Sequence, residues 1–277
     1  MGLSFIVACA SLPPSLWALF RLFLNGFGPS SLDFWLALWT ALVGFTVAFC
    51  ASEPYCSKTT WLLGKSPQHG TIPYWSFFVF APYHLGLRIK LWAARKLFLT
   101  SEPLHNKVLP GWFIGGWPSS PNHLPPGRPS VLDLTCELPR THTNRYMCIP
   151  VWDTRVPSLP QIDEGVDWAL KEYQRNGAVY VHCAHGHGRS AMLLSGCLLK
   201  SGEALSLDHA VTIMTKVRPR VKLSSRQRRQ MEKWAELRTG QQAQPKNSRG
   251  ASMDVNATAA GAASGLRRVA SEMDTTV

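Results

Sequence analysis

Residues 179–190, VYVHCAHGHGRS, have the types and spacing that could do chemistry on an anion. The pattern predicts a buried strand, a loop with two glycines and a helix that begins near Arg189. Such a loop points backbone N–H groups inward at a helix N-terminus, which favours a bound anion. The same field favours a thiolate at Cys183, because helix termini and cationic neighbours lower a thiol pKa to about 3.5–7.5. Arg189 can offer its planar guanidinium to two phosphate oxygens, so the segment predicts nucleophilic attack on a phosphoryl group.

Residues 182–190 match the H-C-x-x-G-x-x-R-S signature of the cysteine-dependent protein tyrosine and dual-specificity phosphatases. The resemblance extends over about residues 110–234. It implies an α/β fold with a central, mostly parallel sheet flanked by helices. It also implies hydrolysis through a phosphocysteine with no metal or other cofactor. On this resemblance the phosphate is bound by Cys183, Ala184, His185, Gly186, His187, Gly188 and Arg189.

The general acid is expected at Asp153. The segment YMCIPVWDTRVPS resembles the strand and mobile loop that deliver this acid in the family, and its aspartate precedes the cysteine by thirty residues, as is typical of the dual-specificity group. Asp153 would protonate the leaving alkoxide and then activate water. Asp133, Asp163 and Glu164 are rival acids. The first lies inside a predicted strand, and the other two open a helix, where acidic residues also serve as caps.

Two neighbours of the motif receive roles from the same resemblance. Ser190 would stabilise the Cys183 thiolate as a leaving group, and His182 would hold the backbone of the nucleophile, although each could be an ordinary cap or core residue. His185 and His187 occupy variable positions, so we expect them at the pocket mouth and partly cationic near pH 6.5. A metal bound by these histidines is a competing idea, but an H-x-x-H-x-H cluster in a phosphate loop is awkward for one ion. No metal site is therefore predicted.

The first hundred residues contain long apolar stretches that are typical of a membrane region. Residues 34–50 contain no charge and come close to crossing a hydrocarbon core of about 30 Å. A buried helix of a soluble domain is the alternative. Residues 3–27 are apolar but contain two prolines and an arginine, and could form a kinked span or an interfacial helix. Residues 72–87 are a third candidate with a basic flank, so we expect two or three spans within residues 1–100.

The rest of the chain alternates short apolar runs with helical patterns, which favours a mostly parallel sheet with helices on both faces. Residues 101–240 are the predicted catalytic domain, and residues 118–129 are a proline-rich loop. Residues 241–277 are too poor in large apolar side chains to fold, and are predicted to be disordered. The expected strands are 112–116, 131–135, 146–151 and 178–183, and the expected helices are 161–176, 189–201, 207–217 and 225–238.

A formal net charge of +12 over 277 residues suggests a polyanionic partner. Eight basic residues lie between 216 and 233, and we expect them to contact an anionic membrane, with a solvated helix face as the alternative. Nucleic acid is not expected, because no aromatic interleaving or known module supports it. Seven cysteines without CxxC spacing argue against disulfides and favour a reducing compartment, with the catalytic domain facing the cytosol or its equivalent. The basic residues are Lys216, Arg218, Arg220, Lys222, Arg226, Arg228, Arg229 and Lys233.

Together these features predict a membrane-anchored phosphomonoester hydrolase. A phospholipid headgroup phosphate, such as that of phosphatidylglycerophosphate or a phosphoinositide, is the preferred substrate, because anchoring beside a bilayer raises the effective concentration of lipids. A protein carrying phosphotyrosine, phosphoserine or phosphothreonine is the alternative. An inactive phospho-ligand-binding scaffold is a more distant one, since the cysteine, the arginine and the acid are all present. The organelle and the oligomeric state are not predicted.

Overall fold

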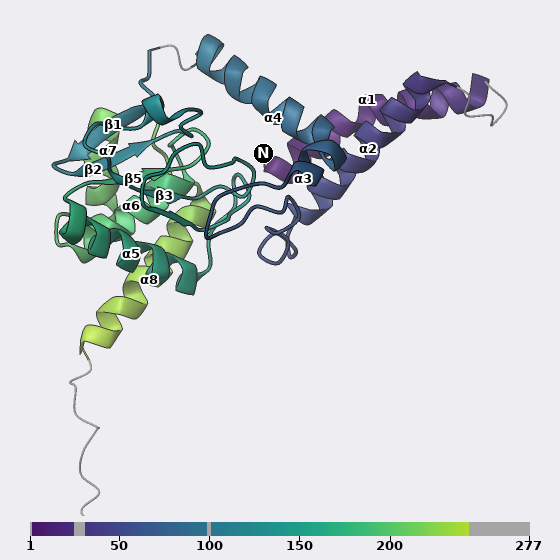
Figure 1. Cartoon of the computed structure of the whole chain (residues 1–277). Coiled ribbons are helices and arrows are strands. Elements are labelled where there is room, and N and C mark those ends of the chain that lie inside the picture. Colours follow the sequence, from purple (N-terminus) through teal and green to yellow (C-terminus); the bar gives the residue numbers. More distant parts are fainter. Residues whose placement is uncertain (1, 25–30, 99–100, 244–277) are drawn as a thin grey trace, which may run out of the picture.

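The computed structural model describes residues 2–24, 31–98 and 101–243. A helical hairpin extends away from an α/β domain (Figure 1). Its helices are α1 (Leu3–Leu24) and α2 (Leu32–Cys50), which run side by side. A Cβ atom at Gly44 would collide with Ser11, so this glycine allows the two helices to approach closely. At the far end of the hairpin Arg21 pairs with Asp33 at 3.0 Å.

Both hairpin helices are long and apolar enough to cross a membrane by length and composition. Their best windows have a mean hydropathy of 1.7, and only 17% of the α1 window and 33% of the α2 window is buried. Helices of a soluble core are mostly buried, so this exposure distinguishes the hairpin from a core. The two prolines lie inside one continuous α1 helix.

The third candidate span is not one helix. It divides into α3 (Tyr74–Val79) and α4 (Ala81–Ala93), which is followed by a π-helical turn, η1 (Ala94–Phe98). Pro82 lies in the first turn of α4, where its missing N–H is tolerated, and Phe80 caps that helix in a non-helical conformation. Within the described residues the predicted range of two or three spans therefore narrows to two candidate helices.

The domain contains a five-stranded sheet with the order β1-β2-β5-β3-β4. The four strands from β2 to β4 in this order are parallel, while β1 pairs antiparallel with β2 at one edge. The predicted α/β class and mostly parallel sheet are confirmed. Residues of β2, β3 and β5 are all buried, as expected for strands inside a parallel sheet. The strands are β1 (His105–Leu109), β2 (Trp112–Gly115), β3 (Ser130–Asp133), β4 (Tyr146–Cys148) and β5 (Val179–His182).

Four helices share one hydrophobic core with one face of this sheet. The first begins with a capping box, in which Ser158 and Gln161 satisfy each other's backbone N–H groups, and ends at Gly177 in the left-handed conformation. On the opposite face Phe113 and Tyr180 pack with Leu124 of the proline-rich loop, which contains one short 3-10 turn, η2 (Pro121–His123). The helices are α5 (Leu159–Asn176), α6 (Arg189–Lys200), α7 (Leu207–Val217) and α8 (Ser225–Ala243).

The segment between the hairpin and α3 packs into the α/β domain. Lys65 is buried, and its Nζ donates to Asp133 Oδ2 at 2.6 Å and to the Thr135 carbonyl at 2.7 Å. Leu63 is fully buried in a cluster that also contains Trp152. The division of the chain at residue 100 remains a prediction, but residues on both sides of it share this core.

The start of α1 also contacts the domain. The backbone N–H of Leu3 donates to Thr154 Oγ1 at 3.0 Å, and Arg155 donates to Ser4 Oγ at 3.0 Å. Arg155 also donates to the carbonyl of Ala51, directly after α2, at 2.7 Å. Both domain-proximal ends of the hairpin therefore hold one loop, residues 152–155. Helix α8 continues five residues past its predicted end, and residues 244–277 of the predicted disordered tail lie outside the described residues.

Candidate active site

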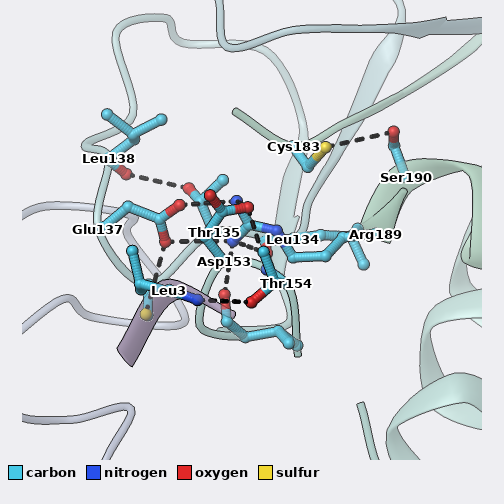
Figure 2. A network of polar contacts seen from close by, with 12 residues as sticks. Leu3, Leu134, Thr135, Glu137, Leu138, Asp153, Thr154, Cys183, Arg189 and Ser190 are labelled. Carbon is cyan, nitrogen blue, oxygen red and sulfur yellow. Dashed lines mark hydrogen bonds and ion pairs between the residues drawn. The ribbon is translucent and has the colours of Figure 1, made fainter. Parts of the chain in front are cut away.

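The loop between β5 and α6 surrounds the sulfur of Cys183. This residue directly follows β5, and its Sγ accepts the backbone N–H of Gly186 at 3.2 Å and lies 3.5 Å from Ser190 Oγ (Figure 2). Gly186 has a φ of 83°, and a Cβ atom there would collide with the backbone of Gly115. Only glycine fits this turn, because it combines a left-handed conformation with a close backbone approach.

The surroundings of Cys183 favour its thiolate. Burial opposes ionisation, but the nearby Arg189 charge, the Ser190 hydroxyl and the Gly186 N–H together outweigh it and lower the pKa of Cys183. A thiolate is the nucleophilic form of cysteine. Cys183, at the N-terminus of a helix, therefore ionises more readily than an ordinary cysteine.

Arg189 is buried, with a relative exposure of 2%, and two carboxylates, Glu137 and Asp153, accept hydrogen bonds from its guanidinium. Glu137 accepts two hydrogen bonds from it, at 2.7 Å from Nη2 and 3.2 Å from Nη1. The carbonyl of Val151 accepts another from Nη1 at 2.6 Å. Arg189 Nε has no hydrogen-bond partner among the residues that the structure describes. An unpaired buried donor is costly, so this Nε is available to an oxygen of a bound phosphate.

Asp153 lies between two cations at the same cavity. Its Oδ1 accepts a hydrogen bond from Arg189 Nη2 at 3.1 Å (Figure 2). Its Oδ2 lies 3.5 Å from Lys90 Nζ of α4. Burial raises the pKa of Asp153. The nearby Arg189, Lys90 and His185 lower it by more, so the net shift is downward. Without substrate this carboxyl is ionised.

Two of the three rival acids have structural partners. Asp133 is buried against Lys65, which together with His182 lowers its pKa to about 2 although burial opposes ionisation. Asp163 accepts from Trp234 Nε1 at 2.6 Å. Among Asp133, Asp153, Asp163 and Glu164, only Asp153 lines the cavity that contains Cys183.

The cavity has a volume of about 380 Å³. It brings together the predicted Cys183, His185, His187, Gly188, Arg189 and Asp153, whereas Ala184 and Gly186 belong to the loop without lining the space. Within residues 2–24, 31–98 and 101–243 no group of three or more histidine, cysteine or acidic side chains is placed to hold a metal. The lining residues are Asp153, Thr154, Cys183, His185, His187, Gly188, Arg189, Lys222, Ser224 and Gln227.

The expected partial charge near pH 6.5 is wrong for His185. Burial lowers the pKa of His185 to about 4, although Asp153 acts in the opposite direction. Burial also lowers the pKa of His187, even though its Nε2 lies 2.6 Å from Glu102 Oε1. His185 is consequently neutral near pH 6.5. The two rings stack at 6.2 Å between centroids and form a wall of the cavity.

His182 occupies a supporting position beneath the loop. It is buried, its Nδ1 lies 3.3 Å from the Cys183 carbonyl oxygen, and its Nε2 lies 3.8 Å from Asp133 Oδ1. Burial lowers its pKa despite the nearby carboxylate. The ring therefore lies between the nucleophile's backbone and the buried Lys65 pair.

Sequence reasoning missed the role of Arg218. It assigned this residue to a basic surface, but Arg218 is buried and donates to the loop carbonyls of His185 at 2.7 Å and Gly186 at 3.1 Å. It also pairs with Glu102 at 2.6 Å. Arg218 therefore holds the backbone of the loop through its carbonyl groups. Because this residue is buried, the segment 216–233 is not a single membrane-facing surface. Lys222, from the same segment, lines the catalytic cavity.

A cysteine in a loop of inward N–H groups, followed by a helix whose first residue is arginine, defines a site of the cysteine-dependent phosphatase type. Residues 129–236 match the family "Dual specificity phosphatase, catalytic domain". This part of the chain is therefore similar to a dual specificity phosphatase catalytic domain, and the match includes all of the predicted catalytic residues.

Curated relatives match a shorter part of the chain. The human protein "Phosphatidylglycerophosphatase and protein-tyrosine phosphatase 1" is 35% identical over 65 residues, which cover 24% of this chain and 32% of that protein. The rat protein of the same name is 33% identical over 70 residues, 25% of this chain and 36% of its own length. The chain thus spans about a third of the relatives that it matches.

Solved structures with similarity to the domain include PTPMT1 in complex with PI(5)P and human DUSP28. The PTPMT1 complex is 21% identical to this chain with a TM-score of 0.44, and the match covers 50% of this chain and 99% of the PTPMT1 chain. DUSP28 is 20% identical to this chain with a TM-score of 0.45, and the match covers 50% of this chain and 96% of the DUSP28 chain.

Proposed function

We propose that this chain hydrolyses phosphate monoesters through a covalent phosphocysteine at Cys183. The observation that carries the proposal is the placement of an activated sulfur, held by the Gly186 N–H at 3.2 Å, in one cavity with the unpaired Nε of Arg189. The similarity to a dual specificity phosphatase domain supports the same chemistry.

In the first step the Cys183 thiolate attacks phosphorus, and the bond from phosphorus to the ester oxygen breaks. Asp153 gives its proton to that oxygen, because an alkoxide is a poor leaving group. A bound phosphate dianion would compete with Asp153 for Arg189. Loss of this cation and the added negative charge would raise the pKa of Asp153, so that the acid is protonated when substrate is present.

In the second step water attacks the phosphorus of the phosphocysteine. Asp153, now a carboxylate, accepts the proton of this water, and the Cys183 sulfur leaves as a thiolate. Ser190, whose Oγ lies 3.5 Å from the sulfur, stabilises the departing negative charge. Inorganic phosphate and the free enzyme are the products.

The proposed substrate is a phospholipid headgroup phosphate at a membrane surface. The exposed apolar hairpin supports this assignment, because it would anchor the domain beside a bilayer. The names of the curated relatives include phosphatidylglycerophosphatase activity. The same names include protein-tyrosine phosphatase, so a phosphoprotein is the second candidate. We further propose that residues 1–100 form the anchoring region and that the catalytic domain faces a reducing compartment, where its cysteines stay free.

The test is phosphate release by the purified full-length chain in mixed micelles containing EDTA. The substrates would be phosphatidylglycerophosphate, a phosphoinositide, a phosphotyrosine peptide and a small aryl phosphate. We expect hydrolysis by the wild type, loss of activity in Cys183→Ser, and a loss of about 10²–10⁴-fold in Asp153→Asn. Cys9→Ser, at an exposed position, is the matched control. Full activity in Cys183→Ser would refute the mechanism, and faster turnover of the peptide than of both lipids would refute the substrate assignment.

A further inference from the structure

A second cavity lies between α1, α2 and α4. It has a volume of about 380 Å³ and is separate from the one that contains Cys183. Its lining is mainly apolar, with Ile6, Val7 and Leu87 among the side chains. Helices α1 and α2 are the two candidate membrane spans, so the cavity opens within the part of the molecule that is suited to hydrocarbon.

One end of this groove reaches the catalytic residues. Lys90 lines the groove and lies 3.5 Å from Asp153, which lines the catalytic cavity. Leu3 also lines the groove, and its N–H donates to Thr154, another residue of the catalytic cavity (Figure 2). The apolar groove and the catalytic cavity are therefore adjacent, and their lining residues contact one another directly.

Tyr83 forms part of the groove wall, and its hydroxyl is buried rather than open to the groove. Its side chain lines the groove and is only 9% exposed, and its hydroxyl has no hydrogen-bond partner in the described part of the chain. The ring packs edge to face on Trp152, next to Asp153, at 6.4 Å between centroids. Tyr83 therefore joins the wall of the groove to Trp152, the residue before Asp153.

Gly86 leaves part of the groove open. A Cβ atom at this position would meet no other atom within 4 Å. The glycine is therefore not required by close helix packing, unlike Gly44. A large side chain at position 86 would occupy the groove without displacing the backbone.

We propose that this groove holds an acyl chain of a lipid whose phosphate monoester is bound at Cys183. Lys90, whose side chain is partly exposed, would bind the polar oxygens that join the chain to the headgroup. This inference rests on the proposed function and names its substrate as a long-chain lipid. Phosphopeptides and soluble phosphate esters lack a hydrocarbon chain that could occupy the groove.

Lipid binding would also affect the general acid. An anionic oxygen beside Lys90 would attract this lysine away from Asp153, since the two are only 3.5 Å apart. Removal of the cation favours the protonated carboxyl that the first chemical step requires. A lipid with an anionic linkage would thus bind and prepare the acid in one event.

The first test fills the groove in the full-length chain. We would compare Gly86→Trp with Leu85→Trp, which adds similar bulk at a neighbouring, 62% exposed position. The measured quantity is the ratio of kcat/KM for dioleoyl phosphatidylglycerophosphate to that for its dihexanoyl analogue. We expect this ratio to fall at least tenfold in Gly86→Trp and to stay within twofold of wild type in Leu85→Trp. An unchanged ratio in Gly86→Trp, or an equal fall in both variants, would overturn the proposal.

The second test does not require turnover, so it separates the groove from the proposed reaction. A dioleoyl-like lipid phosphate with a photoreactive group on its acyl chain would be crosslinked to the full-length Cys183→Ser protein in micelles, and the labelled peptides sequenced. We expect labels on groove residues of α1 and α4, and a several-fold lower yield in the same protein carrying Gly86→Trp. Labels confined to outward positions such as Leu85, with no effect of Gly86→Trp, would contradict acyl binding even if the enzyme is active.

Discussion

Ser190 and Ser195 lie on the same helix but have different partners. Ser190 Oγ is 3.5 Å from the Cys183 sulfur, whereas Ser195 donates to the carbonyl of Ala191 in its own helix. We expect Ser190→Ala to raise the pKa of Cys183, because it removes one of the groups that lower it. Below that pKa each unit of increase reduces the thiolate fraction about tenfold.

The measurement is the rate at which iodoacetamide alkylates the Cys183 peptide between pH 5 and 8, followed by mass spectrometry. Cys183 in Ser190→Ala should be alkylated about three- to tenfold more slowly than in the wild type at pH 6. This range corresponds to an increase of up to about one unit in the pKa of Cys183. Ser195→Ala should match the wild type. Equal alkylation of all three proteins at every pH would show that Ser190 does not stabilise the thiolate.

Among the site residues, those that lie close together along the chain could be identified from the sequence. Cys183, Arg189 and Ser190 belong to one short motif, and the structure places them around one sulfur. The supporting Glu137 and Arg218 were missed, because each reaches the loop from more than thirty residues away. The lowered pKa of His185 was missed for a related reason, since burial cannot be read from a motif.

Among the structural elements, the segment between α2 and α3 makes an ion pair inside the domain. Lys65 Nζ and Asp133 Oδ2 lie 2.6 Å apart, with side-chain exposures of 0% and 1%. Removing one partner of a buried pair leaves an uncompensated charge and costs about 3–5 kcal/mol. We expect Lys65→Met to lower the free energy of unfolding by about this amount at pH 7. The exposed Lys58→Met, in the same segment, should have little effect.

The pH dependence of this loss has a defined sign. The folded pKa of Asp133 is lowered to about 2, against about 3.9 in unfolded chains. Its contribution to stability is therefore complete above the unfolded value and is lost as the pH falls through about 2. Thermal unfolding in detergent should show the wild type and Lys65→Met converging as the pH falls from 4 toward 2. A difference that stays constant, or one shared by Lys58→Met, would contradict a stabilising pair.

Most elements of the domain were predictable, because their periodic patterns and turn residues are local. Strands β2, β3, β4 and β5 and all four domain helices lie within a few residues of their expected bounds. Strand β1 was missed, since HNKVL is a polar edge strand with a single fully buried residue. The embedded position of Lys65 was also missed, because a lone lysine in an apolar region carries no signal of its distant partner.

The arrangement of the whole molecule constrains how it could lie in a membrane. The N-terminal end of α1 contacts Thr154, and the chain after α2 contacts Arg155, so both ends of the hairpin are at the catalytic domain (Figure 1). If both helices cross a bilayer, the N-terminus and the catalytic domain must share one side. The pair of Arg21 and Asp33 then lies near the opposite surface.

Protease protection of sealed vesicles tests this arrangement. A tag at the N-terminus and an epitope in the catalytic domain should be digested together or protected together, and the protein should resist alkaline carbonate extraction. A control protein with one known span would show one protected end. Protection of only one of the two sites here, or release by carbonate, would contradict the two-span hairpin.

The covalent phosphocysteine proposed at Cys183 can be trapped in an acid-quenched reaction of the full-length chain. Asp153→Asn, which slows both steps, would be mixed with aryl phosphate, quenched within milliseconds to seconds and digested for mass spectrometry. Aryl phosphate is suitable because its leaving group depends least on protonation. We predict phosphate on the Cys183 peptide and none when Cys183→Ser is added to the variant. Substrate turnover by the wild type with no phosphate on Cys183 in the variant would contradict the mechanism.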